Sequence, residues 1–408
     1  MLQLLRHHDA RLLLAGQTLS MFSDSAMYLV LGIWVKALTG SNAAAGLVFF
    51  ALAIPSLAGP IAGLLVDRVR RRPLMIVADC FIGAAVLSLL LVRGSGQLWL
   101  IYLVTILYGA SASVFVSAQS ALLTVLLPDE LLGDANAAFQ TVRQGLRLVA
   151  PLAGAGLFAA FGGGAVAALD AASFVASALC LAALRTHEGA PAPQIGRFRE
   201  DVSAGIQHIL HTLPLRQIVF AVGVALLVVG FTETLIFAVV DEGLHRAPSF
   251  LGVLTVFQGV GAIAGGLTAG RAVRRLGDGR VTGLGLFLFA AGDALLIAPS
   301  LPLAIGGFVV AGAGLSWAIV GFGTAIQRRS PAHLQGRVYS AANTITGTPQ
   351  TISIALGAAL ATFFSYQLLL AVMAVVTAAC GIYLVSRGTF RDLPAGETQD
   401  GAVNLLSG

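Results

Sequence analysis

The chain has 408 residues, of which 57% are hydrophobic and 11% are charged, and its mean hydropathy is +0.89. This composition is too apolar for a soluble globular domain and excludes that class. The formal net charge of +5 does not indicate a nucleic acid as partner, because Lys and Arg occur in short clusters between apolar runs, where anionic lipid headgroups are the expected contact.

Twelve apolar stretches are long enough to cross a membrane as helices. A helix rises 1.5 Å per residue, so about 20 residues cross a hydrocarbon core of about 30 Å. The sequence therefore predicts an all-α membrane protein with twelve transmembrane helices, the first of them an uncleaved N-terminal span. The predicted spans are 11–36, 43–65, 73–92, 98–126, 137–160, 164–184, 216–239, 249–270, 280–298, 303–326, 338–362 and 367–386.

The distribution of basic residues predicts the orientation in the membrane, since cytoplasmic loops carry the excess of Lys and Arg. With the N-terminus inside, the outward loops and span ends hold only Lys36, Arg93 and Arg246 of the 24 basic residues. We therefore expect both termini to be cytoplasmic and the protein to be a multi-pass protein of the cell inner (cytoplasmic) membrane.

An internal repeat divides the chain into two halves. The segment GLLVDRVRRRP begins at Gly63, and the similar segment GLTAGRAVRRLG begins at Gly266, 203 residues later. A parallel repeat of this kind predicts two pseudo-symmetric six-helix bundles. The expected parts are an N-terminal bundle (1–186), a cytoplasmic linker (187–214), a C-terminal bundle (215–388) and a cytoplasmic tail (389–408).

The linker contains apolar residues at helical spacing. Phe198, Val202, Ile206 and Ile209 fall on one face, which predicts an amphipathic helix. Such a helix either lies on the inner membrane surface or simply joins the two bundles.

The loop after the second span resembles the signature loop of the major facilitator superfamily, GxLaDrxGrr, with Arg70 at the usual Gly position. Three further segments resemble the drug-efflux branch that includes macrolide exporters and the enterobactin exporter: Asp24 after GQTLSMFS, ANAAF at 135–139 and LDAASF at 169–174. The chain departs from the antiporter pattern in the fourth span, which lacks an Arg near Tyr108, and in the fifth, where GPxxGG is degenerate. The resemblance covers nearly the whole chain.

The resemblance implies a gating role for the signature loop and its repeat. Asp67 is expected to latch the inner face by pairing across the halves near the start of the eleventh span. The arginines either hold lipid or neighbouring helices, or they anchor the loops by the positive-inside rule. The expected gating residues are Gly63, Asp67, Arg68, Arg71, Arg72, Gly266, Arg271, Arg274 and Arg275.

Carboxylates inside the predicted spans are candidates for function, because a charge at the bilayer centre is costly. Asp24 lies 13 residues after Arg11 and 12 residues before Lys36, at mid-depth of the first span. Glu233 is its counterpart in the seventh span. The resemblance places spans one, four, seven and ten around a central cavity, so that Asp24 and Glu233 would face each other and couple transport to protons. Alternatively, Asp24 only pairs with a neighbouring helix and Glu233 is a solvated gate residue.

Five other charged residues near the spans have weaker functional signals. Asp79, Asp170 and Asp293 lie in spans that the resemblance makes peripheral, and we expect them to make interhelical hydrogen bonds. Arg143 and Arg147 begin the fifth span on one face, where they either act as counter-ions or extend to the cytoplasmic headgroups.

Aromatic and amide side chains in the cavity-lining spans form the expected substrate surface, although each could equally face lipid or pack inside the protein. Walls of this kind suit an apolar or weakly cationic amphiphile. The expected lining residues are Gln17, Tyr28, Tyr108, Phe115, Gln119 and Trp317.

These features predict a secondary active transporter that exports small amphiphilic compounds, such as drugs, antibiotics or siderophore-like metabolites, by proton antiport and alternating access. The chain contains no GxxxxGK[ST] phosphate loop, so we expect a proton gradient as the energy source and no cofactor. An importer of a small nutrient or metabolite with the same fold is the alternative. An intramembrane enzyme is a remote alternative and no metal site is expected, because all seven His lie in loops or at span ends. The expected partners are the substrate, protons and membrane lipids, without nucleic acid, and the protein is expected to be a monomer.

Overall fold

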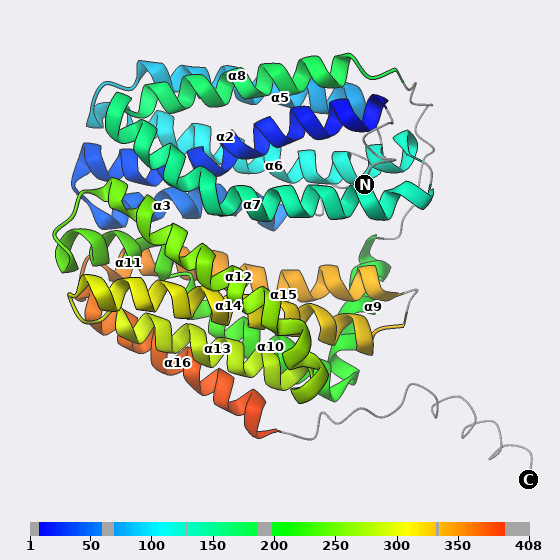
Figure 1. The fold of residues 1–408 in the computed structure, drawn as a ribbon, viewed down its shortest axis with the longest axis vertical. Helices are drawn as coiled ribbons and strands as arrows, with labels where there is room; N and C mark the ends of the chain where they lie inside the picture. The colour runs from blue at the N-terminus through cyan, green and yellow to red at the C-terminus, as the bar shows by residue number, and fades with distance from the viewer. Residues whose placement is uncertain (1–7, 59–68, 128, 186–197, 332–333, 388–408) are drawn as a thin grey trace, which may run out of the picture.

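The computed structural model describes residues 8–58, 69–127, 129–185, 198–331 and 334–387. Within these ranges the chain is helical and contains no β-strand. The helices form two groups, drawn one above the other in Figure 1, and we call them the N half and the C half.

The helices follow the order that the apolar stretches predict. The N half contains α2 (His8–Thr39), α3 (Asn42–Ala53), α5 (Arg71–Leu87), α6 (Leu98–Leu126), α7 (Asp129–Phe161) and α8 (Gly163–Ala182). The C half contains α9 (Phe198–His211), α10 (Leu213–Val229), α11 (Thr232–Ala238), α12 (Leu251–Leu276), α13 (Asp278–Leu295), α14 (Leu301–Arg329), α15 (Gln335–Leu360) and α16 (Tyr366–Ser386). The predicted spans fall on these helices, except that residues 59–65 of the second span lie outside the described ranges.

Eight helices in the described part of the chain are long and apolar enough to cross a membrane, and Asn42–Ala53 and Val149–Phe161 are shorter apolar helices. This pattern indicates a multi-pass membrane protein. The count of twelve spans and the cytoplasmic position of both termini stay predictions.

Glycines bring α13 and α14 into backbone contact. A Cβ atom added to Gly285 of α13 would lie 2.7 Å from the carbonyl oxygen of Gly314 of α14, and one added to Gly314 would lie 2.6 Å from the carbonyl oxygen of Gly285. Lipid tails are as apolar as Leu, so close approach of backbones at small residues is a main source of helix packing in a membrane. Larger residues at these two positions would separate the helices.

The seventh predicted span, 216–239, lies within one longer apolar segment, Leu213–Gly243, whose helix is interrupted. α10 ends at Val229, α11 begins at Thr232, and a π-helical turn, η4 (Val239–Gly243), extends the segment beyond the predicted end. At the break, a Cβ atom on Gly230 would lie 2.6 Å from Cβ of Ser353 on α15. The interruption therefore coincides with a close contact to another helix, which apolar periodicity along the chain does not reveal.

The linker helix α9 packs on the C half. Ile209 is fully buried in an apolar cluster with Leu215 and Val338, and His208 Nε2 lies 2.7 Å from the carbonyl oxygen of Arg329. The described part of its apolar face thus covers protein instead of membrane, and the side chains of Phe198 and Val202 lie outside the described residues.

The two halves share one apolar core at one end of the molecule. Leu29 and Phe49 of the N half belong to the same buried cluster as Phe237 of the C half, and the rings of Phe49 and Phe237 lie 6.1 Å apart. The burial of α2 follows the same pattern. All residues from 29 to 36, at the joined end, are buried, whereas Arg11 and Leu19 nearer the start of α2 are exposed. In the predicted orientation the joined end is the outer one.

Candidate functional site

Two carboxylates of the N half share one tyrosine hydroxyl. Tyr108 of α6 donates a hydrogen bond to Oδ1 of Asp24 on α2 (2.5 Å), and its hydroxyl also lies 3.5 Å from Oδ1 of Asp170 on α8. Ser20 donates to the other oxygen of Asp24 at 3.5 Å. We call Ser20, Asp24, Tyr108 and Asp170 the acid cluster. A phenol carries a single hydrogen, so it can donate to only one of the two carboxylates at a time.

The helices that carry the acid cluster offer it no nearby cation. α6 and α8 contain neither Lys nor Arg, and the basic residues of α2, Arg11 and Lys36, are 13 and 12 residues away from Asp24. At 1.5 Å per residue these distances are roughly 20 Å along the helix. Asp170 is fully buried, and its Oδ2 has no hydrogen-bond partner among the described residues. These three helices therefore supply no counter-charge at this depth, and a proton or a cationic ligand could neutralise the carboxylates.

A second polar group lies beside the acid cluster. Gln17 Nε2 donates to Ser177 Oγ (3.3 Å), and the buried Asp79 of α5 lies near Ser177. Gln17 is 2% exposed, and Gln119 is also buried. The prediction that both glutamines line a cavity is therefore wrong. Gln17, Asp24 and Tyr28 recur at helical spacing along α2, but packing directs Gln17 into the N half.

Tyr108 is buried as well, and its hydroxyl contacts carboxylates of α2 and α8, so in this conformation its ring does not form an open aromatic wall. Its ring meets Phe174 edge-on at 5.9 Å. The expected hydrogen bonding of Asp170 between helices is confirmed.

Tyr28 connects the halves. It lies one helical turn beyond Asp24 on α2 and donates from its hydroxyl to Oε1 of Glu233 on α11 at 3.2 Å. Its ring packs against Phe49 at 4.9 Å. Asp24 and Glu233 form no hydrogen bond with each other, and the contacts run instead from Asp24 along α2 to Tyr28 and then to Glu233.

A set of polar contacts lies at the end of α2 where the halves join. Lys36 Nζ donates to Oδ2 of Asp241 (2.5 Å) and to the carbonyl oxygen of Gly40 (2.7 Å), and Asn42 Nδ2 donates to Oε1 of Glu242 (2.7 Å). We call Lys36, Asn42, Asp241 and Glu242 the outer latch. The sequence pattern predicted no binding partner for Lys36. The acidic pair Asp241–Glu242, directly after the seventh predicted span, was the feature of the sequence that could have indicated a partner for Lys36.

The remaining expected lining residues lie within their own halves. Phe115 is half-buried and packs on an apolar cluster of the N half. Trp317 is also half-buried, and its Nε1 donates to Thr268 of α12 at 2.9 Å. The described contacts of these two side chains thus do not include the acid cluster or Glu233.

The expected gating residues are only partly visible. Gly63, Asp67 and Arg68 lie outside the described residues, so the proposed latch of Asp67 stays a prediction. Arg72 donates to the carbonyl oxygen of Ala182 at the end of α8 (2.7 Å), within the N half. Arg71 is half-buried at the start of α5, and the repeat residues on α12 are exposed. These are Gly266, Arg271, Arg274 and Arg275.

The two arginines of α7 are not both placed. Arg143 is half-buried, and its Nε is buried without a hydrogen-bond partner among the described residues. The side chain of Arg147 lies outside them. Within the described ranges no three His, Cys, Asp or Glu side chains are gathered where they could hold a metal ion.

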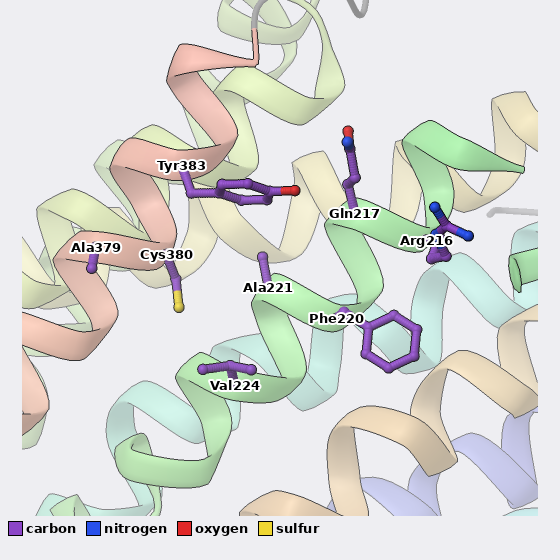
Figure 2. Close-up of a pocket in the computed structure, with 8 residues that line it drawn as sticks. All are labelled: Arg216, Gln217, Phe220, Ala221, Val224, Ala379, Cys380 and Tyr383. Atoms are coloured by element: carbon purple, nitrogen blue, oxygen red, sulfur yellow. The ribbon is translucent and has the colours of Figure 1, made fainter.

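Two of the grooves on the surface lie near the start of α2 and near the start of α10. One lies between α2 and α7, with Arg11, Leu19 and Phe22 among its walls. The other lies between α10 and α16 and is drawn in Figure 2. Neither contains a member of the acid cluster.

Comparison with known proteins agrees with this architecture. The family model of the Major Facilitator Superfamily matches residues 13–241 and again 218–405, so each half matches separately. The uncharacterised MFS-type transporter YfiS of Bacillus subtilis is 26% identical over 395 residues, which cover 92% of this chain and 90% of YfiS. Macrolide efflux protein A of Streptococcus pyogenes is 25% identical over 174 residues, 42% of this chain and 43% of that protein.

Solved transporter structures share the fold. A bacterial homologue of the iron transporter ferroportin in its inward-facing state superposes with a TM-score of 0.71 at 17% identity, covering 94% of this chain and 99% of that one. The outward-facing state of such a homologue gives a TM-score of 0.62 over 93% of this chain and 99% of that one, at 18% identity. The resemblance to an efflux-type branch of the family is confirmed by the macrolide efflux relative. The chain is a transporter and not an enzyme, and it belongs to the Major Facilitator Superfamily.

Proposed function

We propose that the chain is a proton-coupled exporter of small amphiphilic molecules that works by alternating access. The observation that carries the proposal is the position of Asp24. It is bound through Tyr108 to Asp170 inside the N half, and it lies one helical turn from Tyr28, which bonds Glu233 of the C half. A change of charge at this acid cluster can thus act on the contact between the halves.

The joined outer end favours an inward-open resting conformation. The shared apolar core and the outer latch both lie at that end, and the superposition is better with an inward-facing than with an outward-facing relative of the same fold. In this conformation the substrate enters from the cytoplasm or from the inner leaflet. Alternating access then consists of a rocking motion of the halves around the central site.

Substrate and proton compete for the same carboxylates in this mechanism. A weakly cationic amphiphile supplies the counter-charge that α2, α6 and α8 lack at mid-depth. When the outer end opens, the bond from Tyr28 to Glu233 breaks and Glu233 becomes accessible to protons from outside. Protons at Glu233 or Asp24 displace the substrate and return the carrier.

The relative named Macrolide efflux protein A, which matches 42% of the chain, supports export as the direction of transport. We place the protein in the cytoplasmic membrane as a monomer, with the outer latch on the outside. The substrates in this proposal are apolar or weakly cationic compounds of the kind handled by drug exporters.

The test uses proteoliposomes with ethidium as the probe cation and an imposed pH gradient. Asp24→Asn should abolish gradient-driven ethidium transport while ethidium counterflow continues, because the carrier still changes conformation but no longer exchanges a proton. Asp293→Asn is the matched control, a buried carboxylate on α13 of the C half outside the acid cluster. Full gradient-driven transport by Asp24→Asn would overturn proton coupling through this residue, and accumulation in the opposite direction would indicate an importer.

A further inference from the structure

A third buried carboxylate lies inside the N half, apart from the acid cluster. Asp79 of α5 is 1% exposed, and its Oδ2 has no hydrogen-bond partner among the described residues. α5 packs along α8 at the edge of the N half that is farthest from the C half (Figure 1). The side chain is therefore enclosed by protein, and the proton coupling through Asp24 and Glu233 does not use it.

Asp79 lies on the cytoplasmic side of Asp170 in the predicted orientation. A Cβ atom added to Gly83 of α5 would lie 3.7 Å from the carbonyl oxygen of Ala171, the residue after Asp170. Asp79 is four residues before Gly83 and lies near Ser177 of α8. Ser177 is seven residues beyond Asp170 along α8, which runs toward the cytoplasm in this orientation. The levels of the two acids therefore differ by less than about 10 Å at 1.5 Å per residue.

The surroundings of Asp79 are polar but contain mostly acids and neutral groups. Gln17 of α2 donates from Nε2 to Ser177 Oγ at 3.3 Å, beside Asp79. Asp24, also on α2, is near enough to act on Asp79 electrostatically. The further titratable side chains of α6 and α8, which pack against α5, are Tyr102, Tyr108, Asp170 and Cys180.

The basic residues nearest along the chain are at the start of α5. Arg71 and Arg72 precede Asp79 by eight and seven residues, or about 10–12 Å along the helix. Arg72 there donates to the carbonyl oxygen of Ala182 at 2.7 Å. Burying an ionised carboxylate without a counter-charge costs far more than burying the neutral acid. A proton is thus the counter-charge that fits the enclosed site of Asp79.

An apolar plug closes this site toward the cytoplasm. Three side chains of one buried cluster, each at most 1% exposed, form the plug: Leu13, Met75 and Leu181. Each lies four residues, or one helical turn, nearer to the cytoplasmic end of its helix than one of the polar residues Gln17, Asp79 and Ser177. In this conformation Asp79 therefore has the acid cluster on its outer side and an apolar layer on its inner side.

We propose that Asp79 is the inner proton-release site of the transporter, which takes a proton from the acid cluster and passes it to the cytoplasm when the apolar plug opens. In the first step an O–H bond of the acid cluster breaks and one forms at Asp79, which leaves a carboxylate at the cluster for a cationic substrate. In the second step the O–H bond of Asp79 breaks and the proton goes to cytoplasmic water. The inference rests on the proposed proton-coupled export, and it gives the proton a route inside the N half that the substrate does not share.

The experiment measures proton release from the solubilised full chain in weakly buffered solution with a pH-sensitive dye. Rapid mixing with ethidium should produce a fast phase of proton release in the wild type, in step with ethidium binding. Asp79→Asn should bind ethidium but lose the fast phase, because an amide cannot accept the proton. Asp79→Glu should recover the fast phase. Asn has the size of the neutral acid and Glu is larger, so a purely structural role of Asp79 would give the opposite order.

A variant of the plug tests the direction of release. Met75→Ala shortens the plug and should accelerate the fast phase when Asp79 is present. In the double variant Met75→Ala/Asp79→Asn it should have no such effect. Asp293→Asn is the matched control, because Asp293 is also buried and its Oδ2 also has no hydrogen-bond partner among the described residues. Its release should equal that of the wild type. Thermal unfolding of each variant checks that it folds.

Three results would overturn the inference. The first is a fast phase in Asp79→Asn equal to that of the wild type. The second is faster release by Asp79→Asn than by Asp79→Glu. The third is equal acceleration by Met75→Ala with and without Asp79. A wild-type protein that transports ethidium with a pH gradient while Asp79→Asn is unchanged would refute only this inference, whereas a wild type without gradient-driven transport would refute the proposed function itself.

Discussion

Removal of the Lys36 ammonium should open the outer end of the transporter. Lys36→Met keeps the apolar stem but eliminates the bonds to Asp241 and to the carbonyl oxygen of Gly40. Lys36 is 5% exposed and Asp241 is 46% exposed at the side chain. Asp241 can therefore be hydrated by water once its partner is gone, so the variant should fold.

The magnitude follows from this mixed environment. An exposed ion pair contributes about 0.2–1 kcal/mol, and a hydrogen bond to a charged group contributes about 1.5–3 kcal/mol. With one partner buried and the other half-exposed, we expect the latch pair to stabilise the closed outer end by about 1–2 kcal/mol. Since about 1.4 kcal/mol is a factor of ten, the ratio of outward-open to outward-closed molecules should rise about 5- to 30-fold in Lys36→Met.

The assay is a pulsed electron spin resonance distance measurement across the outer end. Spin labels are attached at Ser95→Cys in the N half and Thr362→Cys in the C half, both exposed next to the outer helix ends. The native Cys80, Cys180 and Cys380 are replaced by Ser. Lys36→Met should add a population at longer distance.

A double-mutant cycle separates the ion pair from other effects of the substitution. Asp241→Asn should give a similar shift, and the double variant should shift no further than either single variant. Additive shifts in the double variant, or an unchanged distance distribution in Lys36→Met, would refute the assignment of Lys36 and Asp241 as a latch.

Three further substitutions test other contacts. Gly46→Val puts a side chain where a threonine of α11 now lies, so the same spin labels should report mainly the longer distance; a normal closed distribution would contradict this contact. Tyr28→Phe removes the hydroxyl that bonds Glu233 of the C half and should weaken gradient-driven ethidium export. Tyr102→Phe, whose hydroxyl bonds within the N half, should leave export unchanged. Equal effects of the two substitutions would exclude a special role for the bond between the halves. Gly285→Leu should lower the unfolding temperature, because overpacking costs about 1–3 kcal/mol of folding free energy. Gly306→Leu places its side chain in open space and should leave the unfolding temperature unchanged. Equal unfolding temperatures of the two variants would show that α13 and α14 can separate at no cost.

The two halves contribute different polar groups to the candidate site. The N half holds the acid cluster and the buried Asp79, while the C half contributes Glu233 and the acidic side of the outer latch. α2 contributes Asp24 to the acid cluster, Tyr28 to the contact with Glu233 and Lys36 to the outer latch. A displacement of α2 is thus able to alter the acid cluster and the contact between the halves together.

Local features of the sequence determined the broad architecture. The length of the apolar stretches identified the helices, because the thickness of the hydrocarbon core sets the number of residues that a span requires. The charge of Asp24 in an apolar run identified it as unusual, and the repeat at Gly63 and Gly266 identified the two halves. These conclusions need only distances along the chain.

Partners of individual side chains were decided by the tertiary structure. Gln17 and Tyr28 lie on one stripe of α2, yet Gln17 is buried against Ser177 while Tyr28 reaches Glu233, 205 residues away. Periodicity gives the direction of a side chain relative to its own helix, but the neighbour in that direction depends on how distant helices pack, as with Lys36 and Asp241. Helix packing is cooperative over the whole bundle, so these pairs appear only when all the helices are placed together.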